Sequence, residues 1–299
     1  MTGSALALAM TLVTESVILG SPPVAPPDDG DAASETLQAQ TDIEDRMTID
    51  VAVHGDGPYR FLIDTGSQNT VVSTSLAQAL KLPAGPTVRV VSIAGEVRVA
   101  TAKVHDIDVG ARSFYDLTVP LLQDHHIGAD GILGTDSLQH QRIVLDFVKN
   151  TIEIGDPHDM KGKRGYEIVV RAKRRTGRLV MTNALVDGIR TDVVIDTGAS
   201  ITVGNRALQR AMRERFKGTG TLTSVTGQTL SVDFQLAGTL KVDRLKVSNV
   251  AIAFADAPAF AELGLKERPA IFLGMRELRV FNRIAIDFTT RKILFDLPG

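Results

Sequence analysis

The sequence carries one short motif twice. Residues 61–67 read FLIDTGS and residues 193–199 read VVIDTGA, so the two aspartates are 196 − 64 = 132 positions apart. Each aspartate ends an apolar run, where a strand buried on both faces should not carry a charge unless that charge is used or matched. Because the same costly feature occurs twice, we expect the chain to consist of two similar structural units.

The elements around the motif repeat in the same order. Each copy has a predicted β-hairpin leading into the motif, a second hairpin with glycine near its tip, two apolar residues followed by glycine, and a final apolar segment. The segments TDSL and MREL, which follow the third element, predict short helical turns. In the first copy the four elements occupy residues 47–64, 94–110, 132–134 and 142–154, and in the second copy residues 178–196, 225–243, 272–274 and 283–295.

This ordered set resembles a retropepsin-type aspartic protease lobe, and two such lobes in one chain resemble the pepsin arrangement. The resemblance covers the chain after about Met47. It implies an all-β fold of two retropepsin-like β-barrel lobes, with short helices after each apolar-apolar-Gly segment. The expected division of the chain is an N-terminal apolar segment and disordered linker at residues 1–45, a first lobe at 46–160 and a second lobe at 161–299.

The resemblance places catalysis at Asp64 and Asp196. Peptide hydrolysis without a metal ion or a covalent nucleophile needs a general base that activates water and a general acid for the leaving amine. Two adjoining carboxyl groups that share one proton can supply both, and aspartic proteases are the standard illustration of such a pair. We therefore expect no cofactor and no metal ion in this site.

The residues that follow each aspartate have supporting roles in this family. Thr65 and Thr197 are expected to hydrogen-bond across the lobe interface. Gly66 and Gly198 let the backbone pass close to the carboxyl groups because glycine has no Cβ. The copies then differ, since Ser67 in the first copy stands where the second has alanine. Such differences accompany changes in carboxyl acidity in this family, so we expect an asymmetric pH profile that shifts when Ser67 is replaced by Ala.

A peptide substrate is expected to lie extended in the cleft between the lobes and to hydrogen-bond as an added strand. The tips of the glycine-bearing hairpins would close over it as flaps and exclude water. Two such tips favour two flaps, and neither contains the tyrosine that marks the pepsin flap. The alternative interpretation is that both tips are ordinary turns of exposed hairpins. The candidate flap residues are Ile93, Ala94, Gly95, Val225, Thr226 and Gly227.

Composition argues against several other functions. A net charge of −2 gives no general attraction to nucleic acid, and the absence of cysteine excludes disulfides and thiol catalysis. Asp124, His125, His126 and Asp130 could be imagined as metal ligands, but a polar loop explains them better because the second copy has no counterpart. The basic segment at residues 171–178 is interpreted as a solvated hairpin edge, with docking of an acidic partner or of lipid headgroups as the alternative.

The N-terminal segment bears on cellular location. Residues 5–13, ALALAMTLV, resemble the apolar core of a secretory signal, and residues 21–34 have the composition of a linker. The positive flank of a signal is missing, since the first Lys or Arg is Arg46. We expect a periplasmic or secreted protein, with a cytoplasmic location as the alternative. The apolar run is too short for stable insertion in a membrane. One chain supplies both lobes, so we expect a monomer.

The expected function is that of an aspartic endopeptidase acting on protein or peptide substrates. The alternative is a catalytically silent peptide-binding module that keeps the fold. A binding module has no need for two opposed carboxyl groups, whose repulsion costs stability. A third possibility, an unrelated β protein with coincidental motifs, is made remote by the four repeated elements.

Overall fold

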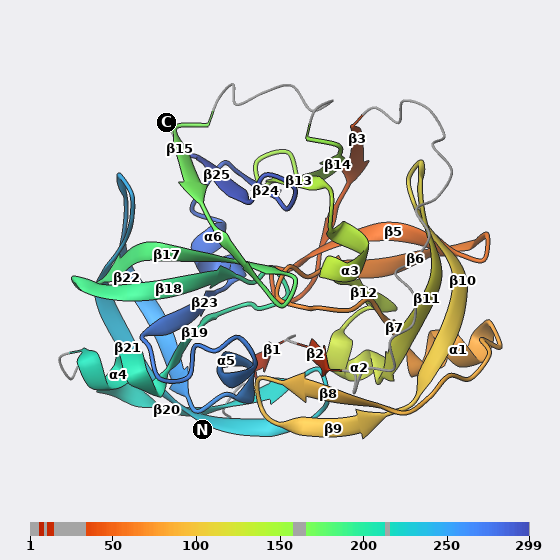
Figure 1. Cartoon of the computed structure of the whole chain (residues 1–299), viewed down its shortest axis with the longest axis horizontal. Helices are drawn as coiled ribbons and strands as arrows, with labels where there is room; N and C mark the ends of the chain where they lie inside the picture. The colour runs from red at the N-terminus through yellow and green to blue at the C-terminus, as the bar shows by residue number, and fades with distance from the viewer. Residues whose placement is uncertain (1–5, 9–10, 15–33, 158–165, 213–215, 299) are drawn as a thin grey trace.

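The computed structural model of the chain describes residues 6–8, 11–14, 34–157, 166–212 and 216–298. Most of the N-terminal segment and linker expected at residues 1–45 lies outside these ranges. The described residues form two lobes that stand side by side and are bridged at one end by a shared sheet (Figure 1).

The first lobe is a ring of six strands. The strand order is β10-β11-β7-β12-β6-β5, and a further pairing of β10 with β5 closes the ring into a barrel. The strands are β5 (Met47–Val53), β6 (Asp56–Ile63), β7 (Val71–Ser73), β10 (Thr101–Val109), β11 (Arg112–Leu122) and β12 (Gly131–Leu133).

The second lobe is a ring of six strands with the same connectivity. Its order is β21-β22-β19-β23-β18-β17, closed by pairing of β21 with β17. The prediction of an all-β chain built from two barrel lobes is therefore confirmed. The strands are β17 (Arg178–Val186), β18 (Ile189–Ile195), β19 (Thr202–Asn205), β21 (Thr229–Val242), β22 (Leu245–Ala255) and β23 (Ala270–Leu273).

A six-stranded sheet with the order β15-β25-β24-β13-β14-β3 joins the lobes at the upper side of Figure 1. Its two central strands come from different lobes and pair antiparallel, with Val144 opposite Ala285. Arg142 crosses the same junction to form a buried ion pair with Asp287 at 2.8 Å. The strands are β3 (Glu35–Gln38), β13 (Arg142–Asp146), β14 (Thr151–Gly155), β15 (Ile168–Arg171), β24 (Arg283–Asp287) and β25 (Lys292–Asp296).

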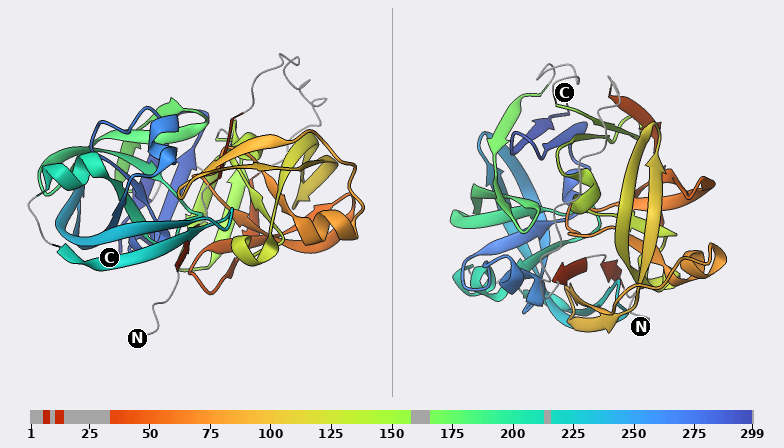
Figure 2. Two further views of the ribbon diagram at one scale, coloured as in Figure 1. Left: turned by 90° about the horizontal axis from the view of Figure 1, so that it is seen from below. Right: turned by 45° about the vertical axis from the view of Figure 1, so that its right-hand side comes forward.

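Two hairpins extend from the lobes on the side opposite to this sheet (Figures 1 and 2). The first is formed by β8 (Val88–Ser92) and β9 (Glu96–Val99), and the second by β20 (Phe216–Ser224) and the start of β21. Two short N-terminal strands add to them: β1 (Leu6–Leu8) pairs parallel with β20, and β2 (Thr11–Thr14) pairs antiparallel with β8. Two more short strands, β4 (Gln40–Thr41) and β16 (Lys173–Arg175), lie at sheet edges.

The helices are short and lie between strands. The segments TDSL and MREL form α3 and α6, as predicted from their place after each apolar-apolar-Gly segment. Within the described residues, no helix is long and apolar enough to cross a membrane. The helices are α1 (Thr74–Ala79), α2 (Asp124–Ile127), α3 (Thr135–Leu138), α4 (Arg206–Ala211), α5 (Pro258–Glu262) and α6 (Met275–Leu278).

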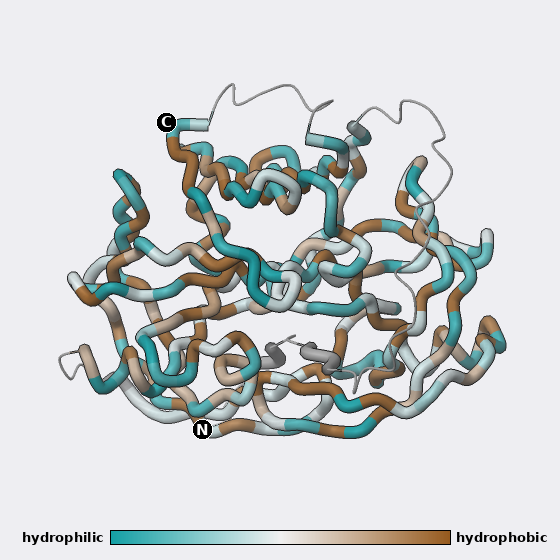
Figure 3. The backbone as a smooth tube through the Cα atoms, viewed as in Figure 1, coloured by the Kyte–Doolittle hydropathy of each residue, from teal (hydrophilic) through white to brown (hydrophobic). Residues whose placement is uncertain are grey.

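The core follows from the alternation of side chains along each strand. In β5, Met47, Ile49 and Val51 are buried, whereas Asp50 between them is exposed. The largest buried cluster includes residues of both lobes and of the joining sheet. Figure 3 shows apolar residues spread along the strands of both lobes.

Candidate active site

The two Asp-Thr-Gly loops meet between the lobes. Asp64 directly follows β6 and Asp196 directly follows β18, and both carboxylates are fully buried, with 0 % exposure. The amide of each aspartate donates to the carbonyl of the leucine that ends the adjacent parallel strand, Leu133 at 3.1 Å and Leu273 at 3.0 Å. The apolar-apolar-Gly segments therefore fix where each catalytic candidate leaves its barrel.

The two threonines lock the loops to each other, as the sequence predicted. The Thr65 hydroxyl donates to the carbonyl of Ile195 at 2.9 Å, and the Thr197 hydroxyl donates to the carbonyl of Ile63 at 2.6 Å. Each hydroxyl also accepts the other threonine's amide, at 3.0 Å for the Thr65 amide and 3.4 Å for the Thr197 amide. Since all of these groups are buried, the lobes are held in register at the carboxyl groups.

Gly66 and Gly198 lie directly against the carboxyl group of the opposite lobe. A Cβ built at Gly66 would stand 2.6 Å from Cγ of Asp196, and one at Gly198 would overlap the carboxyl group of Asp64. Real Cβ atoms do not approach this closely, so any side chain here would push the two aspartates out of place. The glycines are therefore required for the close approach of the loops.

The glycines of the apolar-apolar-Gly segments have a second packing role. A Cβ at Gly134 would strike the backbone of Asn69, and one at Gly274 would stand 2.5 Å from the backbone of Ile201. The Gly134 amide donates to the Thr70 hydroxyl at 3.2 Å. In the second lobe the Gly274 amide donates to the Thr202 hydroxyl at 3.1 Å. Both segments pass beneath the Asp-Thr-Gly loops, as predicted, and support the site from below.

Burial dominates the electrostatics of the two carboxyl groups. It raises the pKa of Asp64 to about 6, against the amides of Gly66 and Ser67 and the charge of Arg178, which lower it. It raises the pKa of Asp196 well above its ordinary range, and the neighbouring charge of Asp64 raises it further. Like charges in a buried site cannot both ionise easily, so one proton shared by the pair is favoured.

The two carboxylates receive different numbers of amide donors. Asp64 accepts the Gly66 amide at 2.8 Å and the Ser67 amide at 3.0 Å, whereas Asp196 accepts the Gly198 amide at 3.2 Å. The Ser67 hydroxyl donates to the carbonyl of Asn69 at 2.8 Å. The effect of Ser67 on acidity, expected from the sequence, stays a prediction.

The tips of the two hairpins touch each other. The Thr226 hydroxyl donates to the Ser92 hydroxyl at 3.2 Å, and the Gln228 side chain donates to the carbonyl of Glu96 at 3.2 Å. Gly227 has a φ of 78°, a left-handed conformation that favours glycine. The candidate flap residues around Gly95 and Gly227 are thus brought into contact with each other and are at least half-buried, so they are not ordinary turns of exposed hairpins. Their closing over a substrate stays a prediction.

The apolar residue at each tip packs into the opposite lobe. Ile93, with 0 % exposure, belongs to a buried cluster of the second lobe that includes Val194. Val225, with 1 % exposure, belongs to a cluster of the first lobe that includes Leu62. Leu62 and Val194 each stand two residues before an aspartate, so the two clusters flank the carboxyl groups. Ala94 and Thr226 are half-buried between the tips.

Sequence reasoning missed two buried arginines. Arg178 was interpreted as the end of a solvated basic edge, and this was wrong, because its side chain has 0 % exposure. Its counterpart Arg46 has 2 % exposure. The spacing of the two arginines, 178 − 46 = 132, equals the spacing of the two aspartates. This equality is the sequence signal that could have identified the arginines as a repeated pair. Elsewhere in the basic segment, Arg174 and Arg175 donate to the carbonyls of Phe288 and Leu263.

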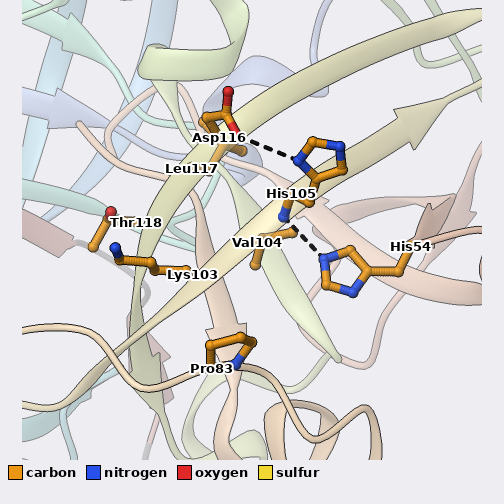
Figure 4. A pocket seen from close by; sticks show the side chains of 8 residues that line it. All are labelled: His54, Pro83, Lys103, Val104, His105, Asp116, Leu117 and Thr118. Carbon is orange, nitrogen blue, oxygen red and sulfur yellow. Dashed lines mark hydrogen bonds and ion pairs between the residues drawn. The ribbon is translucent and has the colours of Figure 1, made fainter.

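Two other features lie away from the carboxyl pair. Among the described residues no group of acidic and histidine side chains is arranged to hold a metal ion, and Asp124 and Asp130 bond to Ser75 and to the amide of Arg60. A groove on the outer face of the first lobe contains the exposed pair His105 and Asp116, 3.3 Å apart (Figure 4). Neither aspartate of the buried pair lines this groove.

Comparison with known proteins gives one result for both lobes. A family model described as aspartyl protease matches residues 49–137 and again residues 182–276, which together exceed half of the chain. Each match contains one Asp-Thr-Gly loop and the apolar-apolar-Gly segment beneath it. A search of curated protein sequences found no match.

Proposed function

The chain belongs to the aspartyl protease family, and we propose that it is an endopeptidase that hydrolyses peptide bonds with water held between Asp64 and Asp196. The observation that carries the proposal is the buried carboxyl pair, in which two aspartates from different lobes are held in contact with the opposite loop and differ in their hydrogen-bond donors.

The proposed roles follow from the proton on the pair. Asp64, which accepts two amide hydrogen bonds, is the charged member of the pair. It takes a proton from the attacking water while the water oxygen bonds to the scissile carbonyl carbon. Asp196 gives its proton to the carbonyl oxygen, producing a neutral gem-diol. Collapse of the gem-diol breaks the C–N bond, transfers the proton on Asp64 to the amine nitrogen and returns a hydroxyl proton to Asp196. The two carboxyl groups supply acid and base, so the proposed reaction uses no cofactor.

The substrate in this proposal is an extended peptide or protein segment. Both flaps already accept an added strand, since β1 pairs with β20 and β2 pairs with β8. A substrate can form the same kind of main-chain hydrogen bonds, with alternate side chains pointing into pockets. The two apolar clusters that flank the carboxyl groups favour apolar side chains on both sides of the scissile bond.

Access to the pair requires movement of the flaps. Both aspartates have 0 % exposure, and the flap tips are joined by the Thr226–Ser92 and Gln228–Glu96 hydrogen bonds. Opening breaks these bonds and also withdraws Ile93 and Val225 from the apolar clusters of the opposite lobes, so the closed flaps are held by hydrogen bonds and by packing. We propose that the flaps open to admit substrate and close to exclude water during the reaction.

The proposal is tested by cleavage of an unfolded protein between pH 3 and pH 8. The full chain is compared with a chain that starts at residue 34, because β1 and β2 would compete with substrate for the flaps. Asp64→Asn and Asp196→Asn are the matched inactive variants, since each keeps its volume and acceptor oxygen but cannot exchange the proton. We expect at least about a thousandfold loss of kcat in both.

Circular dichroism and thermal melting establish that both variants are folded. If the folded parent cuts nothing, or if either variant retains the parent's activity, the proposed roles are wrong. A folded parent that retains peptides without cutting them would support the silent binding module instead. A single-chain monomer and a periplasmic or secreted location stay predictions, checked by sedimentation and by the N-terminus of the native protein.

A further inference from the structure

Arg178 connects one lobe to the catalytic loop of the other. It opens β17 in the second lobe, its side chain has 0 % exposure, and its Nε donates to the carbonyl of Gly66 at 2.5 Å. A buried guanidinium is costly to desolvate and is retained only where its surroundings compensate. Here the hydrogen bond to the Gly66 carbonyl, in the loop that contains Asp64, offsets part of the desolvation cost.

The residue that accepts the Arg178 hydrogen bond, Gly66, also packs against the second carboxyl group. Gly66 lies directly against Asp196, since a Cβ at Gly66 would stand 2.6 Å from its Cγ. The Gly66 amide donates to Asp64 at 2.8 Å. One peptide segment therefore touches both carboxyl groups, and Arg178 holds that segment by its carbonyl.

The corresponding arginine of the first lobe is placed differently. Arg46 forms an ion pair with Asp42 at 2.7 Å and donates to the carbonyl of Ile127 at 2.8 Å. Its charge is therefore matched by a carboxylate of its own lobe. The repeat provides the two arginines, and of this pair it is Arg178 whose side chain donates to an Asp-Thr-Gly loop of the opposite lobe.

We propose that Arg178 is the positioning residue of the carboxyl pair: it fixes the Gly66 segment against Asp196, and its positive charge keeps one of the two carboxyl groups ionised in the buried site. This inference rests on the proposed endopeptidase function, because it assigns the residue that sets the charge state on which that function depends.

The charges around the pair are consistent with this role. Burial lowers the pKa of Arg178 to about 10, so the guanidinium remains charged at neutral pH. The carboxylates that face it are Asp64, Asp196 and, with a smaller effect, Glu262 of α5. Arg178 lowers the pKa of both members of the pair, and its effect on Asp64 is larger than that of Arg46.

The test compares Arg178→Gln, Arg178→Lys and the matched variant Arg46→Gln in the full chain. Because a cation favours the ionised carboxyl, its loss should move the acid limb of the kcat/KM profile of Arg178→Gln upward by about one pH unit. We expect kcat to fall about tenfold at the parent's optimum with KM changed less than about threefold, since positioning acts on the reacting groups. Arg46→Gln should move the limb by less than half as much.

Arg178→Lys separates the charge from the hydrogen bond. It keeps the positive charge but cannot reproduce the planar Nε donor, so the acid limb should stay near the parent's while kcat falls. Its use also keeps the inference testable if Arg178→Gln does not fold. A limb that shifts equally in Arg178→Lys, or that shifts no more in Arg178→Gln than in Arg46→Gln, would overturn the proposal.

Carboxyl ¹³C titration of selectively labelled aspartates separates this inference from the proposed function. The measurement needs no substrate, so it remains informative if the parent has no protease activity. We expect the titration of Asp64 and Asp196 in the parent to begin about one pH unit lower than in Arg178→Gln. Identical titrations in the two proteins would refute a role of Arg178 in setting the charge of the pair, whether or not the chain is an enzyme.

Discussion

The loops at Asp64 and Asp196 share one backbone design but differ in what surrounds each carboxyl group. Asp64 accepts the amides of Gly66 and Ser67, whereas Asp196 accepts the Gly198 amide and is followed by a buried alanine in an apolar cluster. The first environment solvates a negative charge better than the second. The comparison indicates that a duplicated unit can supply two chemically distinct roles through a few local differences.

The largest effect is expected from replacing the two hydrogen-bonded threonines, Thr65 and Thr197, which join the loops. Thr197→Val removes the 2.6 Å bond to the Ile63 carbonyl and the 3.0 Å bond from the Thr65 amide, leaving two buried groups without these partners. We expect a loss of about 3 kcal/mol in the free energy of unfolding. Thr65→Val removes a 2.9 Å bond and a longer 3.4 Å contact, so we expect a loss of about 2 kcal/mol.

Urea unfolding of both variants measures the two losses, and valine keeps the volume of threonine. The control is Thr226→Val at the flap tip, which should change unfolding by less than about 1 kcal/mol because its residue is only half-buried. Equal losses in the two threonine variants would mean that the interlock is symmetric despite the unequal distances.

An effect of intermediate size is expected from the destabilisation that the buried carboxyl pair causes at neutral pH. A raised pKa means that the folded state binds a proton more tightly than the unfolded state, so stability falls as pH rises from about 4 through the raised pKa. Burial raises the pKa of both groups. Replacement by neutral Asn should therefore stabilise the fold at pH 7, by roughly 1.4 kcal/mol for each unit of raised pKa. We expect the larger gain for Asp196→Asn, since Asp196 accepts the Gly198 amide whereas Asp64 accepts the amides of Gly66 and Ser67.

Thermal melting at pH 4 and pH 7 measures both effects. The gain should fall below about 1 kcal/mol at pH 4, because the folded carboxyl groups are then protonated and those of the unfolded chain are about half protonated. A larger gain for Asp64→Asn than for Asp196→Asn would reverse the assignment of the proton and, with it, the proposed roles of acid and base.

The smallest expected effect comes from Ser67→Ala, which makes the first loop resemble the second. The amide donor to Asp64 at 3.0 Å is kept, while the hydroxyl bonded to Asn69 is lost. We expect the acid limb of the pH profile to move upward by less than about half a unit, because the carboxylate loses part of its polar surroundings. An unchanged profile of kcat/KM would remove Ser67 from the account, with Ala199→Ser as the reciprocal variant.

The main features of the fold and the site were predictable from local sequence patterns. The Asp-Thr-Gly motifs, the apolar-apolar-Gly segments and the helical turns after them recur in order, and the structure places each where the repeat requires it. The two threonines were expected to bond across the lobes, and they do. These predictions succeeded because each depends on a short stretch of chain whose chemistry has few alternative uses.

The buried arginines were not predicted, because position along the chain does not show where a long charged side chain ends. Arg178 closes a run of basic residues that resembles a solvent-exposed edge, and its side chain instead passes into the lobe interface. The crossing of the flap tips was also not foreseen. Ile93 and Val225 each look like the apolar end of a local hairpin, although each packs into the other lobe.

The sequence by itself determined the duplicated architecture, the identity of the two aspartates and the need for glycine beside them, because hydrophobic periodicity and backbone sterics act over short distances. Only the tertiary structure shows which carboxyl group accepts two amides, which arginine bonds to the opposite Asp-Thr-Gly loop and which lobe each hairpin tip packs into. These properties depend on distances between residues more than a hundred positions apart, such as Arg178 and Gly66. Burial and charge acting across the lobe interface therefore distinguish two loops that the sequence presents as near copies.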